Sequence, residues 1–235
     1  MEHGYEIDDE SRKRALATAG IPEAFSGLRL TDIGFEHDAV FEAWGKTKGF
    51  AVSGNTGCGK SSFAAACVRS FFRANHPRST ARIEKGWLDG DWAQFMKWPL
   101  QSSLWTFAPD LLGRIKTTFD HGSKEREGDV MNLYATIPLL VIDDLGVQSQ
   151  TDWAWEKIAS IFGARNDNNK FTIVTMNQSL KDFADKETKA TGHDRIASRM
   201  SAYWTVELPD RDRRADAARG REPLRPKNPP TGETT

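Results

Sequence analysis

The sequence predicts an α/β fold in which helices cover both faces of a parallel sheet. Short apolar segments typical of buried strands recur along the chain, at residues 49–53, 104–108, 138–143, 171–176 and 203–208. Helical patterns separate these segments, and strands that alternate with helices indicate parallel pairing. Because ligands of such sheets bind at the carboxyl ends of the strands, we expect the chemistry just after residues 53, 142 and 176.

The composition is that of a globular protein with some sequence that does not pack. The chain has 235 residues, of which 38% are hydrophobic and 28% charged, and its net charge is −1. That balance excludes a global basic field, so any binding of nucleic acid has to come from a local patch. No apolar run reaches the length of a membrane span, and the N-terminus lacks the apolar core of a signal peptide. We therefore expect a cytoplasmic protein with no membrane partner.

The chain divides into a globular middle and two polar ends. Residues 1–14 predict a flexible N-terminal arm, and residues 15–208 predict one globular domain. Within that domain, the segment 78–102 is rich in tryptophan and forms an insert. Residues 209–235 mix charges with prolines and contain almost no large apolar residues, which predicts a disordered tail.

Helical segments follow the first three strands, and each shows an apolar stripe at helical spacing. Thr151 is suited to cap the third of these helices. The positions expected on the buried faces are Phe63, Cys67 and Phe71 in the first helix, Leu111, Leu112, Ile115 and Phe119 in the second, and Trp155, Ile158, Ala159 and Phe162 in the third.

Residues 54–61, GNTGCGKS, match the full pattern of a phosphate-binding loop between a predicted strand and a predicted helix. Glycines let backbone N–H groups surround phosphates, and the following helix directs its positive amino end at them. Lys60 adds a charge for the β- and γ-phosphates, and Ser61 supplies an oxygen to Mg²⁺. The loop therefore predicts binding of a nucleoside triphosphate. The residues expected to contact it are Gly54, Asn55, Thr56, Gly57, Cys58, Gly59, Lys60, Ser61 and Ser62.

Polar residues follow two further buried strands. Asp143 and Asp144 end the third strand, where adjacent carboxylates cost several kcal/mol unless they meet a cation or water. They suit either the cap of a turn or, beside a phosphate-binding loop, a metal ligand in Asp143 and a group that orients or deprotonates water in Asp144. Asn177 follows the fourth strand, where its amide can reach a γ-phosphate or the attacking water, although asparagine is also common in turns.

Two sets of basic residues have alternative interpretations. Arg195 and Arg199 lie one helical turn apart, which suits either a solvated face or arginines offered to a neighbouring subunit's ATP. Arg114 and Lys116 lie on the helix from Pro109 and suit either a solvated face or contacts to DNA. The tryptophans of residues 78–105, which stand beside basic residues, can stack on single-stranded DNA, but they can equally close a small core or form a partner contact.

Four motifs occur in order: GNTGCGKS, LLVIDDLG, TIVTMN and DRIASRM. Together with the entry segment RALATAGIPEAFSGLRLTDI, this set resembles the DnaC/DnaI helicase-loader clade of AAA+ ATPases, which is related to DnaA, and it is also similar to IstB-type transposition ATPases. The resemblance covers residues 12–214 and is weakest at 78–102. It implies a P-loop NTPase fold of the AAA+ type, with a five-stranded parallel sheet and the phosphate-loop strand at its centre.

The resemblance also implies roles for these residues. ATP and Mg²⁺ would be the cofactors, with Lys60 and Ser61 as the Walker A pair and Asp143 and Asp144 as the Walker B pair. Asn177 would be the first sensor, and Arg199, with Arg195 beside it, the arginine finger of a ring or filament. In the family the helix after the second strand faces single-stranded DNA, which favours DNA contacts by Arg114 and Lys116.

Departures from the family keep more than one function open. Only a short arm precedes the AAA+ core, little sequence remains after Leu208 for a helical lid, and the tryptophan-rich segment is extra. The first hypothesis is an ATP-dependent loader that assembles on DNA, single-stranded rather than duplex, and delivers a replicative helicase. The second is a regulator of a mobile element that assembles on duplex DNA and recruits a transposase or another recombinase. A nucleotide-dependent interaction module without hydrolysis is disfavoured by the intact acids and by Asn177.

Overall fold

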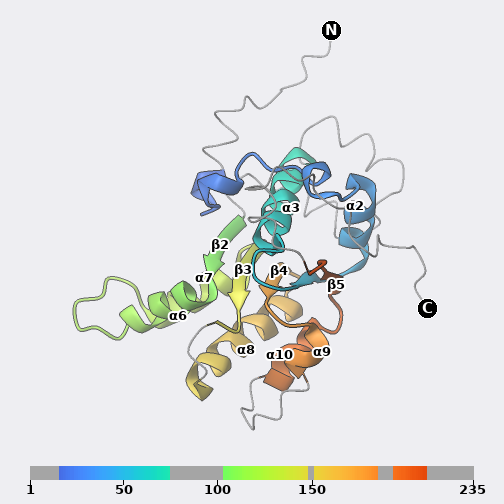
Figure 1. Cartoon of the computed structure of the whole chain (residues 1–235). Helices are drawn as coiled ribbons and strands as arrows, with labels where there is room; N and C mark the ends of the chain where they lie inside the picture. Colours follow the sequence, from blue (N-terminus) through green and yellow to red (C-terminus); the bar gives the residue numbers. More distant parts are fainter. Residues whose placement is uncertain (1–15, 75–102, 148–150, 185–192, 211–235) are drawn as a thin grey trace.

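A sheet of five strands, in the order β2-β3-β4-β1-β5, forms the centre of the molecule (Figure 1). The computed structural model describes residues 16–74, 103–147, 151–184 and 193–210. All strand pairs are parallel. The strands are β1 (Gly49–Ser53), β2 (Ser103–Phe107), β3 (Leu139–Leu145), β4 (Phe171–Met176) and β5 (Trp204–Glu207). The five predicted strands are confirmed, with ends shifted by two residues or fewer.

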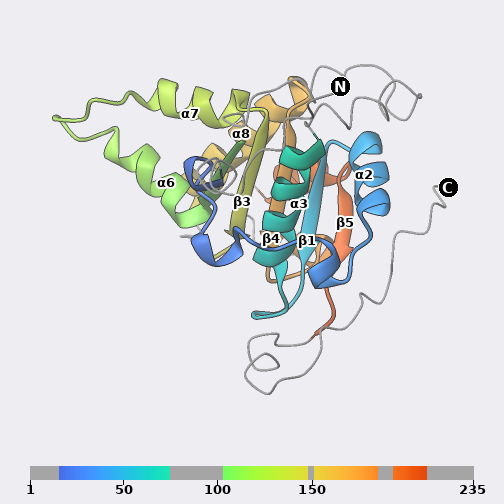
Figure 2. The same cartoon turned by 90° about the horizontal axis from the view of Figure 1, so that it is seen from above.

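Helices cover both faces of this sheet, as predicted (Figure 2). On one face, α2 and α3 pack with the entry segment over a first hydrophobic cluster. On the other face, α6 to α10 pack over a second. The α-helices are α2 (His37–Lys46), α3 (Lys60–Ala74), α6 (Ala108–Thr117), α7 (Glu127–Thr136), α8 (Asp152–Asp167), α9 (Leu180–Ala184) and α10 (His193–Met200), and two 3₁₀ turns, η1 (Glu23–Phe25) and η2 (Thr31–Ile33), precede them.

The strand that leads into the phosphate loop is buried on both faces. Phe50 and Val52 belong to the cluster under α2 and α3, whereas Ala51 belongs to the cluster under α8 and α10. β1 lies between β4 and β5, and β4 holds the middle of the sheet. The expectation that the phosphate-loop strand is central is therefore wrong by one position, although β1 is hydrogen-bonded along both edges.

The three predicted helices are present as α3, α6 and α8. Thr151 caps α8, since its side-chain oxygen accepts a hydrogen bond from the N–H of Ala154 at 3.3 Å. The predicted buried faces are confirmed for all positions except Phe71, whose side chain is outside the description, and Phe119. Phe119 lies beyond the end of α6 and is 55% exposed, because the helix stops at Thr117 and turns away.

Several predictions fall on segments that the structure does not describe. The N-terminal arm, the tryptophan-rich insert at 78–102 and residues 211–235 are among them, so the predictions of a flexible arm, of a disordered tail and of little or no lid stay predictions. Trp105 is described, and it is buried in β2 against Phe25, which excludes it from stacking on DNA. Across the described ranges, no helix is both long and apolar enough to cross a membrane.

Candidate nucleotide-binding site

Three of the predicted sites meet at the carboxyl edge of the sheet. The register pairs Ser53, the last residue before the phosphate loop, with Met176 on β4 and with Glu207 on β5. On the other side, Phe107 at the end of β2 pairs with Asp143. One edge of the sheet therefore carries the loop after β1, the acids that end β3 and Asn177 after β4, as predicted for a parallel sheet.

Glycines shape the loop between β1 and α3. Gly54, Gly57 and Gly59 have φ angles of 149°, 86° and 105°, which side chains rarely allow. A Cβ atom at Gly54 would also lie 2.7 Å from Sγ of Cys58, so the turn has no room for a side chain there. α3 begins at Lys60, directly after the loop. The first N–H groups of a helix have no partner within the helix and can bind an anion.

Lys60 lies folded into the loop. Its side chain is only 6% exposed, and Nζ donates to the carbonyl oxygens of Gly54 at 2.8 Å and of Asn55 at 2.9 Å. Cys58 is buried, Asn55 and Thr56 are exposed, and Gly57, Gly59 and Ser62 are half-buried. The ammonium group is thus held where phosphate oxygens would replace the two carbonyls as its partners.

Asp143 is joined to the loop by a hydrogen bond. The hydroxyl of Ser61 donates to Oδ1 of Asp143 at 3.0 Å, and the hydroxyl of Thr175 donates to the same oxygen at 2.5 Å. The second oxygen, Oδ2, is buried and has no protein partner. Burial raises the pKa of the Asp143 carboxyl, and the hydrogen bonds from Thr175 and Ser61 oppose that shift.

These groups fit a magnesium–nucleotide complex. Mg²⁺ prefers oxygen ligands and is held by one or two carboxylates together with substrate phosphates. Ser61 and Asp143 supply such oxygens side by side, and the orphaned Oδ2 of Asp143 can accept from a metal-bound water. No cluster of three or more acidic, histidine or cysteine side chains is found among the residues that the structure describes. Mg²⁺ held by Ser61 and Asp143 would take its remaining ligands from phosphate oxygens and water.

Asp144 and Asn177 stand at the same edge but are less enclosed. Asp144 is half-buried and has a φ of 58°, an unusual conformation for a residue other than glycine. Asn177 is exposed directly after β4. The roles of Asp144 toward the attacking water and of Asn177 toward the water or the γ-phosphate stay predictions.

Arg195 and Arg199 lie one helical turn apart on α10. The guanidinium of Arg199 rests on α8, where a Cβ at Gly163 would come within 2.9 Å of its Nε atom. It donates to the carbonyl oxygen of Arg195 at 3.2 Å. Arg195 is exposed and Arg199 half-buried.

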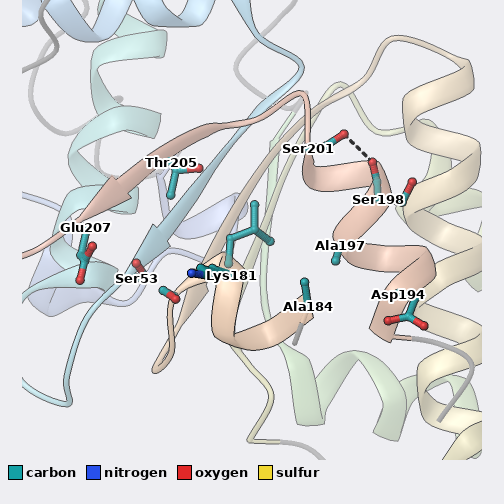
Figure 3. A pocket seen from close by; sticks show the side chains of 11 residues that line it. Ser53, Lys181, Ala184, Asp194, Ala197, Ser198, Ser201, Thr205 and Glu207 are labelled. Atoms are coloured by element: carbon teal, nitrogen blue, oxygen red, sulfur yellow. Dashed lines mark hydrogen bonds between the residues drawn. The ribbon is translucent and has the colours of Figure 1, made fainter. Parts of the chain in front are cut away.

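A hollow of about 700 Å³ separates α9 and α10 from the ends of β1 and β5 (Figure 3). Its floor includes Ser53, Thr205 and Glu207, and α10 lines it with Asp194 and Ser198. Arg195 and Arg199 do not line it. The hollow therefore borders the loop through Ser53 alone, and the two arginines use a different side of α10.

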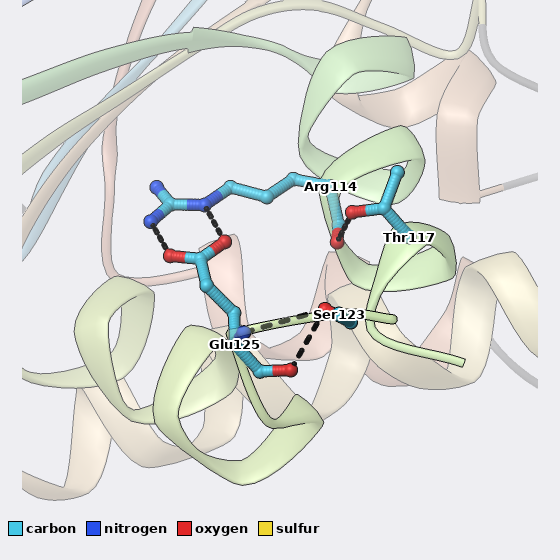
Figure 4. Close-up of polar contacts among 4 residues, drawn as sticks. All are labelled: Arg114, Thr117, Ser123 and Glu125. Atoms are coloured by element: carbon cyan, nitrogen blue, oxygen red, sulfur yellow. Dashed lines mark hydrogen bonds and ion pairs between the residues drawn. The ribbon is translucent and has the colours of Figure 1, made fainter. Parts of the chain in front are cut away.

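The two cations proposed to contact DNA differ in their surroundings. Arg114 forms a two-point ion pair with Glu125, with N–O distances of 3.0 and 2.5 Å (Figure 4). Lys116 is exposed, with Nζ 5.3 Å from the ring centre of Trp153. Phe119 meets the same ring edge-on, at 6.2 Å between centres. The end of α6 and the start of α8 thus present one cation beside two aromatic rings.

Two contacts of the site were not predicted from the sequence. The first is that of Thr175, a polar residue near the end of a largely apolar strand beside the acids. The second is a hydrogen bond of 2.6 Å from the side-chain N–H of Asn55 to Asp210, and a backbone bond from Leu208 to Ser53 accompanies it. The residues that follow β5 therefore lie against the phosphate loop, which no local pattern indicates.

Comparisons with known proteins identify the fold. No protein-family model and no curated protein matches the sequence. A crystal structure of DnaI is similar, with a TM-score of 0.54 and 17% identity over 80% of this chain and 94% of that chain. Domain III of the replication initiation protein DnaA from Thermotoga maritima has a TM-score of 0.52 and 14% identity over 77% of this chain and 66% of that chain. The predicted α/β fold with a five-stranded parallel sheet is confirmed, and the chain shares its fold with these two structures.

Proposed function

Because the chain has the P-loop AAA+ fold of DnaI and DnaA, we propose that it is an ATPase that binds ATP with Mg²⁺ on the loop Gly54–Ser61. One observation carries the proposal: the hydroxyl of Ser61 and the carboxylate of Asp143 lie 3.0 Å apart at the mouth of a glycine loop that opens onto a helix amino end. A loop, a lysine and a paired hydroxyl and carboxylate are the parts that phosphoryl transfer requires.

The chemistry of each group follows from its position. Lys60 moves from the loop carbonyls to the β- and γ-phosphates and neutralises charge that develops on them in the transition state. Ser61 and Asp143 hold Mg²⁺, which supplies further neutralisation when bound. Asp144 orients the attacking water and takes up its proton. Asn177 donates its amide N–H to the γ-phosphate or holds the same water.

The arginines on α10 act between subunits. Arg199 rests on α8 of its own chain, and neither arginine lines the hollow beside the loop. In our proposal both serve an ATP bound on a second copy whose loop packs against α10. Such an arginine stabilises the charge of the transition state in trans. The active unit is therefore a homo-oligomer, a ring or a helical filament.

We further propose that the oligomer assembles on DNA and serves replication. Lys116, Phe119 and Trp153 combine a cation with aromatic rings, which suits single strands better than duplex. Delivery of a replicative helicase is the favoured role, supported by the motif DRIASRM and the likeness to DnaI. Recruitment of a transposase or recombinase on duplex DNA is the second candidate. A pull-down of the replicative helicase with ATP and with ADP separates them, since only the first role predicts nucleotide-sensitive capture.

Replacement of Lys60 tests the nucleotide site. Lys60→Ala removes the charge that faces the phosphates, so we expect it to weaken binding of a fluorescent ATP analogue at least about 100-fold, or about 2.7 kcal/mol. Lys46→Ala is the matched control, because Lys46 pairs with Glu42 on the surface of α2. Equal nucleotide affinity of the Lys60→Ala protein and the wild type would remove the loop from the site.

A further inference from the structure

Asp143 and Asp144 lie in a bulge of the sheet. Between β3 and β4 the register pairs Ile142 with Val174 and then Leu145 with Met176, so the two acids together oppose the single residue Thr175. In a regular strand, neighbouring side chains point to opposite faces. A bulge breaks that alternation, and bulges often re-aim side chains beside active sites.

The side chain of Thr175 completes the hydrogen bonding of this bulge. Its Oγ1 accepts from the backbone N–H of Asp144 at 2.9 Å and donates its only proton to Oδ1 of Asp143 at 2.5 Å. Thr175 is fully buried, so water does not compete for either bond. A single hydroxyl therefore fixes both the carboxylate of one acid and the backbone of the next.

The two bonds have separate consequences. The bond to Oδ1 leaves the buried Oδ2 of Asp143 as the oxygen without a protein partner. The bond from the N–H of Asp144 replaces a ladder bond that the bulge removes, and it holds Asp144 at its φ of 58°. Conformations of this kind are strained and persist only where neighbouring groups impose them.

We propose that Thr175 is a positioning residue for ATP hydrolysis, which sets the metal-facing oxygen of Asp143 and the direction of Asp144 through one hydroxyl. This inference rests on the proposed ATPase function. Thr175 touches neither ATP nor water in this role. Groups behind metal-binding carboxylates change metal affinity or activity by about 10- to 100-fold when they are removed.

The test compares two threonines of the same strand. Thr175→Val and Thr172→Val each remove a fully buried hydroxyl, but the hydroxyl of Thr172 accepts from Arg165 at 2.8 Å at the opposite end of β4. Three quantities are measured: kcat, the Mg²⁺ concentration for half-maximal hydrolysis, and the factor by which Mg²⁺ tightens binding of a fluorescent ADP analogue.

We expect Thr175→Val to lower kcat about 10- to 100-fold, raise the half-maximal Mg²⁺ concentration about 10-fold and abolish most of the magnesium effect on binding. Affinity for the analogue without Mg²⁺ stays within about twofold, because the loop is intact. Thr175→Ser, which keeps the hydroxyl, restores all three quantities to within about threefold of the wild type. Thr172→Val lowers the melting temperature but keeps the wild-type response to Mg²⁺.

If Thr175→Val does not fold, Thr175→Ala removes the same hydroxyl without added volume and takes its place. If the wild type is active and the Thr175 variants match it in kcat and in the response to Mg²⁺, the positioning role is overturned while the proposed ATPase function stands. An equal loss in Thr172→Val would overturn it too, by showing a general effect of buried hydroxyls. A wild type that neither binds nor hydrolyses ATP would overturn the proposed function and this inference with it.

Discussion

Three charged residues, Lys60, Asp143 and Arg165, have exposures of 6%, 1% and 0%. Burial of a charge is costly unless hydrogen bonds replace its water. Backbone carbonyls surround Lys60, two hydroxyls bind Asp143, and oxygens surround Arg165. None of the three has an ion-pair partner among the salt bridges of the described residues. Lys60 and Asp143 can thus interact with a ligand, whereas Arg165 stabilises the fold.

Arg165, on α8, joins the end of α7 to β4. Its NH1 donates to the carbonyl oxygens of Tyr134 and Ile137, both at 2.7 Å, where α7 ends and turns toward β3. Its Nε and NH2 donate to the hydroxyl of Thr172 and the carbonyl oxygen of Phe171 on β4. A positive charge at the carboxyl end of a helix also interacts favourably with the helix dipole.

Loss of Arg165 leaves several buried oxygens without donors. We expect Arg165→Met to lower the free energy of unfolding by about 3 kcal/mol or more, measured by urea denaturation. Arg126→Met, at the exposed residue before α7, serves as the control and stays within about 0.5 kcal/mol of the wild type. An Arg165→Met protein as stable as the wild type would show that these hydrogen bonds contribute nothing net.

Some residues could be placed from the sequence, and others could not. The meeting of Lys60, Ser61 and Asp143 at one edge of the sheet could be predicted, because local patterns place them just after β1 and at the end of β3. Arg165 and Thr175 could not, because their partners lie on other elements: β4 and the turn after α7 for the first, the bulge of β3 for the second. Sequence spacing does not show which elements become neighbours.

At the scale of elements, burial explains which segments the sequence predicts well. The strands β1, β3 and β4 are buried almost throughout, so their apolar runs are unambiguous. Only Val130 and Tyr134 are buried on α7, which leaves too faint a stripe to predict that helix. Phe119 was predicted on the buried face of α6 because its spacing fits that helix. Its ring instead lies against Trp153 on the surface.

The surface at the end of α6 and the start of α8 is the element that we expect to bind single-stranded DNA. Arg114→Ala with Lys116→Ala should weaken binding of single-stranded DNA and reduce the slope of log affinity against log salt concentration. The charge of Arg114 is already paired with Glu125, so Lys116→Ala alone accounts for most of the change, about 0.7 in slope. Affinity is measured by fluorescence anisotropy over a salt series.

The ion pair supplies the control for this experiment. Arg114→Gln with Glu125→Gln removes the pair as a unit and leaves the net charge unchanged, so the slope stays at the wild-type value. A wild-type slope in the Arg114→Ala, Lys116→Ala protein would exclude this element from the DNA site. A large loss from the Gln pair would instead mean that Arg114 leaves Glu125 to bind phosphate.

At the scale of the whole molecule, the sheet order brings the site together. β1, β3 and β4 deliver the loop, the acids and Asn177 to one edge, with β4 between the other two strands. The sequence predicts five parallel strands and the edge at which the chemistry lies, but strand order depends on which strands pair across the fold. The wrong position expected for β1 and the missed contact of Asp210 with Asn55 are both of this long-range kind.

We propose a site shared between two copies, in which the arginines of α10 serve the ATP of a neighbouring copy. Arg199 rests on α8 of its own chain through the space left by Gly163. A copy that lacks Lys60 can still offer Arg199 to its neighbour, and a copy that lacks Arg199 can still bind ATP. Mixing two inactive proteins therefore has a definite expected outcome.

The most direct test is the rate of ATP hydrolysis per chain over a dilution series, with and without Mg²⁺. We expect magnesium-dependent hydrolysis by the wild type, with a rate per chain that falls on dilution. We also expect Lys60→Ala and Arg199→Ala to be inactive alone, and Arg199→Ala to keep wild-type affinity for ATP. Activity should return when the two proteins are mixed. A full rate per chain at monomeric dilution would contradict the shared site, and a wild type without hydrolysis would contradict the proposed ATPase.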